Sequence, residues 1–381
     1  MKINSIVRIC FSVGLILIFS ACSIDFQKHF SANESKMRKA WPNTNFDKRS
    51  INLDEIVFQA VERDGIPPIH SPNYVKANSV TWLDKREPVI VVEINNETKA
   101  YPLQIMIFHE IVSDKIGGIP VIVTFCPLCN ASIVYNRNVG GEVLNFGVSG
   151  SLRKSDLIMY DHQTKSWWQQ FTGKGIVGEY TNTQLEHLPS KVIAFEDYLK
   201  RFPAGDVLSR ETGFNRLYGE NPYAGYDSVD RSPFYFDPHD PRIRAMERVL
   251  AIQVNEIARI YPLSRLVKYP VVNDMLEKEP VVVFSKKGML SVVDKRWIDE
   301  SKTLPSASAY SRVFNNMTLE FKLNEKGIVD INTGSQWNIL GYSTHGSLKG
   351  TQLKQIDRGV YFAFAWLAFK PESEIYVEPK K

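Results

Sequence analysis

The chain has 381 residues, of which 44% are hydrophobic and 23% are charged, and its formal net charge is +4. This length allows one large domain or two to three ordinary ones, with a core of normal size. Basic and acidic residues are nearly balanced, which excludes a dedicated nucleic-acid-binding protein. The sequence has no phosphate loop and no dinucleotide fingerprint, so we expect no nucleotide cofactor.

Residues 1–21 have the pattern of a secretory signal peptide, with basic residues followed by an apolar run over 9–19. This run is too short to span a bilayer comfortably. Phe19-Ser20-Ala21-Cys22 resembles the lipobox of bacterial lipoproteins, although Phe stands where Leu is usual. We expect lipidation of Cys22 and, because Ser follows it, anchoring in the cell envelope at the periplasmic face of the outer membrane. The alternative is an ordinary cleaved signal with an incidental Cys.

Residues 22–50 are polar and without clear periodicity, which predicts a tether. Beyond them the sequence contains a long internal repeat. Residues within 87–123, such as Tyr101-Pro102-Leu103, recur 160 positions later, and an Asp-x-x-Thr-x-Ser-x-Trp pattern begins at both Asp161 and Asp330. We therefore predict a tandem duplication with a first β-rich repeat over 51–210, a linker over 211–240 and a second, degenerate repeat over 241–381. The aromatic residues of the linker predict that it packs against the repeats.

The elements of each repeat are predicted to be mostly strands, so the expected fold class is mainly β, with α+β as the alternative. A Gly-Gly pair supplies the positive φ angles that a two-residue hairpin turn needs, and such pairs occur at 117–118 and 140–141. Each repeat ends in a short helix, before Pro203 or Pro371, and a strand. The strands predicted in the first repeat are 88–94, 97–101, 109–116, 119–125, 131–135 and 143–148.

The hairpin around Gly117-Gly118 places Cys126 in a candidate site. If those glycines are the two loop residues, paired positions sum to 235, and His109 lies directly opposite Cys126. Cys129 follows at the spacing of a metal-binding knuckle. Two thiolates and an imidazole suit copper, zinc or iron, so we predict a transition-metal site with Cys126, Cys129 and His109 as ligands.

Two other interpretations of the cysteine pair stay open. Cys-Pro-x-Cys also occurs in thiol-disulfide oxidoreductases, at the start of a helix whose dipole lowers the thiol pKa. Here residues 131–135 are β-prone, which removes that argument, although His109 could still activate a thiolate. The remaining alternative is an inert pair in a non-catalytic interaction module. Protein partners and oligomeric state cannot be read from the sequence.

The second repeat offers an internal control for the site. Its residues at the positions of His109, Cys126 and Cys129 are Tyr269, Lys286 and Met289. The cluster therefore has no general folding role. Features kept in both repeats are better explained by the fold: we expect the Asp of the Asp-x-x-Thr-x-Ser-x-Trp pattern to cap a turn and the Trp to fill core.

Several strings together resemble one protein family. They are Glu87-Pro88-Val89-Ile90, Ala100-Tyr101-Pro102-Leu103, His109-Glu110-Ile111-Val112, Thr124-Phe125-Cys126-Pro127-Leu128-Cys129 and Tyr160-Asp161. Over about residues 60 to 378 the chain resembles the bacterial and archaeal family called domain of unknown function 3179. Members usually follow the second Cys with Gly, where this chain has Asn130. The resemblance supports the extent of the domain and implies no reaction.

Overall fold

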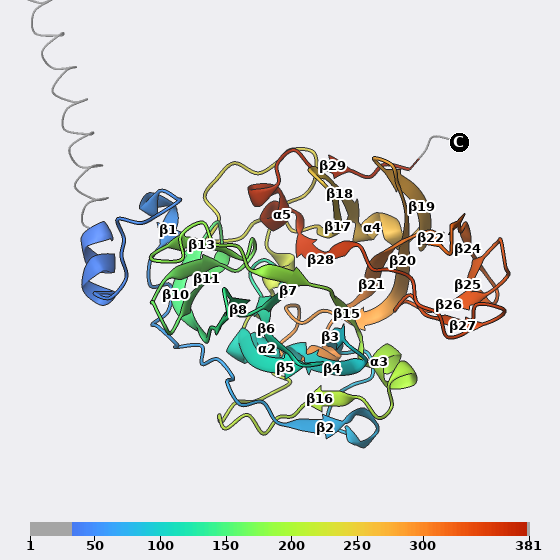
Figure 1. Cartoon of the computed structure of the whole chain (residues 1–381), viewed down its shortest axis with the longest axis horizontal. Coiled ribbons are helices and arrows are strands. Elements are labelled where there is room, and N and C mark those ends of the chain that lie inside the picture. Colours follow the sequence, from blue (N-terminus) through green and yellow to red (C-terminus); the bar gives the residue numbers. More distant parts are fainter. Residues whose placement is uncertain (1–32, 379–381) are drawn as a thin grey trace, which may run out of the picture.

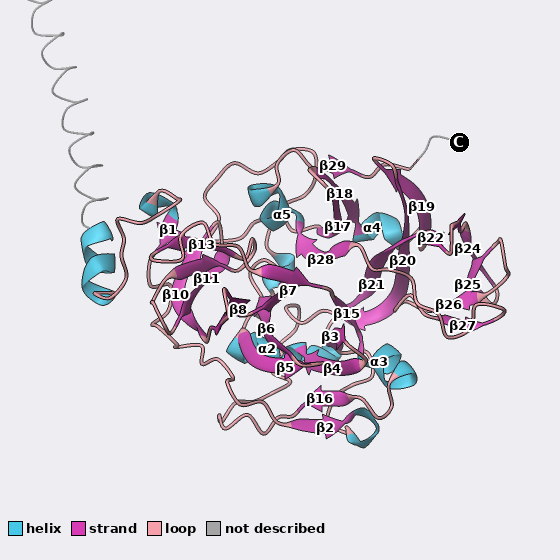
Figure 2. Cartoon of the chain, viewed as in Figure 1, coloured by secondary structure: helices cyan, strands magenta, loops and turns pink. Residues whose placement is uncertain are grey.

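The computed structural model describes residues 33–378. The predicted signal peptide and Cys22 lie outside the described residues. The fold is mainly β, with a few short helices at the edges of the sheets (Figure 2), which confirms the expected class. Besides residues 33–40, the helices are α2 (Leu103–His109), α3 (Phe195–Arg201), α4 (Leu263–Leu266) and α5 (Ala363–Phe369). The 3-10 turns are Leu53–Glu55, Ala77–Ser79, Tyr226–Ser228 and Ile298–Glu300.

The described part of the first half forms three sheets and a small hairpin. In hydrogen-bonded order, one sheet consists of β15 (Ser190–Ala194), β3 (Pro88–Ile94), β4 (Glu97–Pro102), β16 (Asp206–Leu208) and β2 (Tyr74–Lys76). The next consists of β14 (Glu186–Leu188), β7 (Ala131–Asn136), β6 (Ile119–Cys126) and β5 (Ile111–Ile116). The third consists of β1 (Ile56–Val57), β10 (Phe146–Arg153), β11 (Asp156–Asp161), β12 (Trp167–Gln169) and β13 (Lys174–Val177), and the hairpin pairs β8 (Asn138–Val139) with β9 (Glu142–Val143).

The second half repeats this order of elements. One sheet consists of β28 (Asp357–Phe362), β17 (Arg248–Val254), β18 (Ile257–Pro262) and β29 (Glu374–Ile375), and the next of β19 (Val271–Leu276), β20 (Glu279–Leu290) and β21 (Thr303–Ser311). A third sheet and a hairpin follow: β24 (Phe321–Asn324), β25 (Gly327–Asp330), β26 (Gln336–Trp337) and β27 (Ser343–His345), then β22 (Val313–Phe314) with β23 (Met317–Thr318).

Matching residues lie in matching elements of the two halves. Val89 pairs with Pro102 in β3–β4, and Val249 pairs with Pro262 in β17–β18, at the predicted offset of 160. Strand β16 runs parallel to β4, as β29 runs parallel to β18. A common origin by duplication stays a prediction, but the two halves follow one plan of strands and helices.

The two halves pack together across a shared core. One buried cluster contains Val112 and Phe125 from the first half together with Val249 and Phe364 from the second. Strand β28 lies against β7, and β15 lies against β21, so that each half extends a strand toward the other (Figure 1). Part of the segment 211–240 packs against the two halves, since Tyr226 and Ser232 are buried, whereas Phe214 and Phe236 are exposed.

The predicted tether over 22–50 is wrong for its described part. Residues 33–40 are helical, and Met37, Trp41 and Phe46 are buried against Tyr160 and Trp167 of the third sheet. The Trp41 and Trp167 rings meet edge to face, with centroids 5.3 Å apart. Scattered large apolar residues in a polar segment therefore anchor it to the domain, although they show no periodicity in the sequence.

The strand predicted over 109–116 is also too long. Residues 103–109 form helix α2, and β5 begins only at Ile111. The sequence Leu-Gln-Ile-Met-Ile-Phe-His is almost continuously apolar, and six of its seven residues are buried. A short apolar run of this kind has no periodicity that would distinguish a buried helix from a buried strand.

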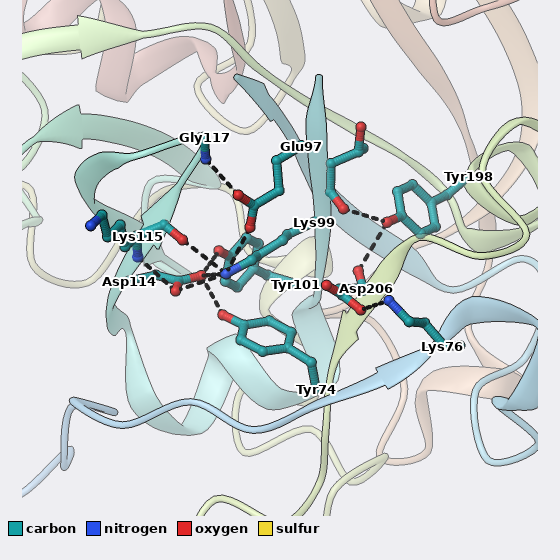
Figure 3. Close-up of polar contacts among 11 residues, drawn as sticks. Tyr74, Lys76, Glu97, Lys99, Tyr101, Asp114, Lys115, Gly117, Tyr198 and Asp206 are labelled. Atoms are coloured by element: carbon teal, nitrogen blue, oxygen red, sulfur yellow. Dashed lines mark hydrogen bonds and ion pairs between the residues drawn. The ribbon is translucent and has the colours of Figure 1, made fainter. Parts of the chain in front are cut away.

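A buried ion pair fixes β5 against β4 (Figure 3). The Lys99 Nζ atom lies 3.0 Å from the Asp114 carboxylate, and both side chains are less than a tenth exposed. The hydroxyls of Tyr74 and Tyr101 donate hydrogen bonds to the same carboxylate. The second half has an equivalent pair, Arg259 with Asp274, 2.7 Å apart. We infer that this pair belongs to the fold and sets the position of β5 and, through it, of β6.

We predict that Asp114→Ala lowers the free energy of unfolding by about 3–5 kcal/mol, because it removes the buried partner of the Lys99 ammonium and leaves only the partly exposed Glu97 carboxylate, 3.4 Å away. Chemical denaturation measures the change. The control is Lys76→Ala, which removes the more exposed pair with Asp206 (Figure 3) and is expected to cost less than about 1 kcal/mol. An equal loss of unfolding free energy in the two variants would contradict a structural role for the Lys99–Asp114 pair.

Candidate functional site

The cysteine pair lies in the tight turn between β6 and β7. The predicted register is confirmed, since Ile111 pairs with Thr124 and the positions sum to 235. Cys126 is the last residue of β6, and the amide of Cys129 donates a hydrogen bond to its carbonyl oxygen at 3.3 Å. Both thiols are free and buried, with no more than 1% of either residue exposed.

A buried carboxylate completes a three-residue cluster. The Asp156 oxygen and the sulfurs of Cys126 and Cys129 all lie within 4.8 Å of one another. Asp156 Oδ2 accepts hydrogen bonds from Gln169 Nε2 at 2.6 Å and from the Phe171 amide at 2.9 Å. Within residues 33–378, Asp156 Oδ1 is buried and has no hydrogen-bond partner. Such an orphaned acceptor is costly unless a ligand or ion satisfies it.

The cluster is acidic and shielded from water. Burial raises the pKa of Asp156 to about 7. Burial, and then the negative charge of Asp156, raises the pKa of Glu110 to about 8. Burial also raises the pKa of Cys126 and of Cys129, so both sulfurs are held as neutral thiols without a compensating cation. The site thus concentrates groups whose charged forms are disfavoured by burial and would be stabilised by a positive ion.

His109 is not part of this cluster, and the prediction that it lies opposite Cys126 is wrong. It ends helix α2 instead of pairing in the sheet. Its Nδ1 lies 2.7 Å from the Pro67 carbonyl oxygen, so that nitrogen carries the hydrogen, and its Nε2 lies 2.6 Å from the Tyr218 hydroxyl. Both nitrogens are thereby engaged. His109 instead fixes the linker to helix α2. The residue beside the thiols, where His109 was expected, is Asp156.

The second half and the linker close the cysteine turn. The Phe362 amide in β28 donates a hydrogen bond to the Cys129 carbonyl oxygen at 3.0 Å. The Tyr226 hydroxyl of the linker donates to the Leu128 carbonyl oxygen, also at 3.0 Å. Backbone groups of the turn are therefore satisfied by segments about 100 and 230 residues away in sequence.

Asn130 connects the turn to a buried ion pair. Its φ angle is +51°, in the left-handed region that Gly and Asn tolerate best. Its side-chain amide donates to the Val360 carbonyl oxygen at 3.0 Å and accepts from Arg248 Nε at 3.3 Å. Arg248 is in turn 2.6 Å from the buried Asp227 carboxylate. Asn130 thus tolerates the left-handed conformation that the turn requires and adds side-chain contacts that a Gly could not make.

The second half keeps the backbone of the site and lacks its chemistry. The Ser285 amide donates to the Pro270 carbonyl oxygen at 2.8 Å, as the Phe125 amide donates to that of Glu110. At the position of Cys126, Lys286 forms ion pairs with Glu196 and Asp197 of the first half. The carboxyl group of Glu110 and both thiols thus have no counterpart.

The hairpin that carries Asp156 is longer in the first half. Its last pair is Arg153 with Asp156, whereas the equivalent hairpin ends at Asn324 with Gly327. Counted back from the Asp that begins each Asp-x-x-Thr pattern, Asp156 corresponds to Glu325, which lies in the exposed turn. Sequence reasoning missed Asp156 and Glu110. A comparison of the hairpin lengths of the two halves would have pointed to Asp156.

The predicted structural roles of the repeated motif are confirmed. Trp168 Nε1 and Trp337 Nε1 each donate to the Asp seven residues earlier at 2.9 Å. Asp161 also caps its turn by accepting from the Thr164 amide. His162 is half-buried against the Tyr160 ring and is no member of the cysteine cluster.

We predict that Asn130→Ala destabilises the protein more than Asn130→Gly does, by about 1 kcal/mol. Both variants lose the amide contacts, but only Ala bears a Cβ in the left-handed conformation. Chemical denaturation of the two variants in parallel measures the difference. Equal stabilities would mean that the turn changes conformation in the variants.

Comparisons with known proteins place the chain in a family without supplying an activity. No curated protein matches it, and no solved structure does. No helix of the described residues is long and apolar enough to cross a membrane. The family model described as a protein of unknown function, DUF3179, matches residues 63–373. The match covers well over half of the chain, which therefore belongs to the DUF3179 family.

Proposed function

We propose that the protein binds one transition-metal ion through the Cys126 and Cys129 thiolates and the Asp156 carboxylate. The observation that carries the proposal is the orphaned Asp156 Oδ1 within 4.8 Å of two sulfurs, in a site closed from water. Metal bonds of about 2.0–2.3 Å place the ligands of one tetrahedral ion roughly 3.5–4 Å apart. Small side-chain rotations would therefore bring the three atoms to one ion.

The donor set favours zinc, iron or copper over calcium or magnesium. Two sulfurs are soft ligands, which the hard cations avoid. Three protein ligands leave a fourth position for water, a substrate or the nearby Glu110 carboxyl group. With a divalent ion, two thiolates and one carboxylate leave a single negative charge. A protonated Glu110, favoured by its raised pKa, keeps that buried charge small.

Thiol-disulfide exchange is the second candidate, and the geometry favours it less. The attacking species is a thiolate, which needs a lowered pKa and access to its partner. Here burial raises the pKa of both thiols, and the turn leads into strand β7 instead of a helix N-terminus. An inert thiol pair in an interaction module would leave the orphaned oxygen of Asp156 unexplained.

We also propose that this binding takes place in the cell envelope, with the chain attached to the membrane through a lipid on Cys22. The support for this location is the signal-like sequence of residues 1–21 and the lipobox resemblance. Along the sequence the folded part begins soon after Cys22, because residues 37–46 already pack onto the third sheet.

We predict that protein purified under reducing conditions binds close to one equivalent of zinc or iron, measured by elemental analysis and by titration with a competing chelator. Cys126→Ser and Cys129→Ser reduce binding to background. Asp156→Asn, which keeps the shape of the side chain, weakens it about 10- to 100-fold. The matched control is His109→Gln, for which we expect affinity within about threefold of wild type.

Loss of metal in His109→Gln with retention in Asp156→Asn would overturn the ligand set. A metal-free wild type that forms a reversible Cys126–Cys129 disulfide with a measurable potential would support the redox alternative. A pair that is inert in both assays would leave the interaction module.

We further predict that metal affinity falls as pH is lowered. The thiols are protonated in the metal-free protein, because burial raises the pKa of both, so binding must displace their protons. Between about pH 8 and about pH 6 the apparent Kd should rise at least about a hundredfold. Chelator competition at the two pH values measures it, and a pH-independent Kd would contradict thiolate ligation.

A further inference from the structure

A cavity of about 460 Å³ lies where β7 and the segment after β12 meet β28 and α5 of the second half. The Phe171 ring stacks on Phe369, with centroids 4.5 Å apart, and lies 5.0 Å from the Tyr361 ring. Tyr135 and Trp366 complete an aromatic lining. Walls of this kind bind the faces of planar rings, and the volume suits a small organic molecule.

Two cationic side chains, Arg358 and Lys370, line the same cavity. Within residues 33–378 neither of them forms an ion pair. Glu186 is the single acidic residue of the lining, and its exposed carboxylate accepts a hydrogen bond from Asn136 at 3.0 Å. Burial, and next to it the Arg358 charge, lowers the pKa of His187 to about 4, so this neighbour is neutral. The cavity therefore has an excess of positive charge.

Arg358 is an extra residue in its strand. In the pairing of β17 with β28, Ala251 is opposite Gly359 and Ile252 is opposite Asp357, so Arg358 forms a bulge. The equivalent pairing of β3 with β15 runs without a bulge. Bulges re-aim side chains and are common beside functional sites. The first half forms the equivalent strand pair without such a residue, so the fold does not require Arg358.

We propose that this cavity binds a planar, apolar carboxylate, such as an aromatic acid, with its ring packed against the aromatic lining and its carboxylate on Arg358. The planar guanidinium matches a carboxylate through two parallel hydrogen bonds. Lys370 supplies a second positive charge at the same cavity. The proposal does not depend on the metal site, since none of its residues belongs to the cysteine cluster.

The test uses the full-length protein, isothermal titration calorimetry and two probes of equal shape, 2-naphthoate and 2-naphthalenemethanol. We expect one saturable site for the acid, with at least about tenfold higher affinity than for the neutral alcohol. Arg358→Gln should lower the affinity for the acid about tenfold and leave that for the alcohol unchanged. The matched control is Lys354→Gln, which removes an exposed cation outside the cavity and should have no effect.

Lys370→Gln provides a second variant at the other cation of the lining, with an expected loss of about threefold, in case Arg358→Gln fails to fold. Equal affinity of wild type for the two probes, or the absence of saturable binding of the acid, overturns the proposal. So does a loss of binding in Lys354→Gln as large as in the cavity variants, because it would show only a general effect of positive charge.

Discussion

Hydrogen bonds between β28 and the cysteine turn join the two halves of the chain at the candidate site. The Phe362 amide donates to the Cys129 carbonyl oxygen, and the Asn130 amide donates to the Val360 carbonyl oxygen, both at 3.0 Å. Strand β28, together with Tyr226 of the linker, closes the turn in which burial raises the pKa of both thiols. The buried, acidic character of the cluster is thus a property of both halves together.

This dependence gives the second half a role although it has lost the cysteines. Its strand β28 lies against β7, as β15 of the first half lies against β21. The fold therefore contains two similar junctions, which differ in their side chains. The thiols, Asp156 at its longer hairpin tip and the bulge residue Arg358 all gather at or beside the β28–β7 junction. These residues differ between two halves that share one fold, so a functional site explains them better than a packing requirement does.

The sequence predicts much of the fold and only part of the site. The strand register around Gly117-Gly118, the closing helices, the turn-capping role of Asp161 and the buried position of Trp168 follow from local patterns and are confirmed. Local patterns could not distinguish helix α2 from a strand, and His109 was misplaced with it. Asp156 and Tyr226 reach the turn from 30 and about 100 residues away, through contacts that no spacing rule describes. Arg358 is visible only once the register of β28 is known.

The segment Gln169–Phe171 forms the wall between the cysteine cluster and the aromatic cavity. Gln169 Nε2 and the Phe171 amide hold Asp156 Oδ2, while the Phe171 ring lines the cavity on the other side. The Tyr135 hydroxyl, from the cavity wall, donates to the Gln170 carbonyl oxygen at 2.9 Å. The second half keeps this last bond, from Tyr310 to Ile339, so the backbone of the wall belongs to the fold. The first half adds the Asp156 contacts to that backbone. A shift of the Phe171 main chain caused at the cysteine cluster would therefore be felt in the aromatic cavity, and a shift caused in the cavity would be felt at the cluster.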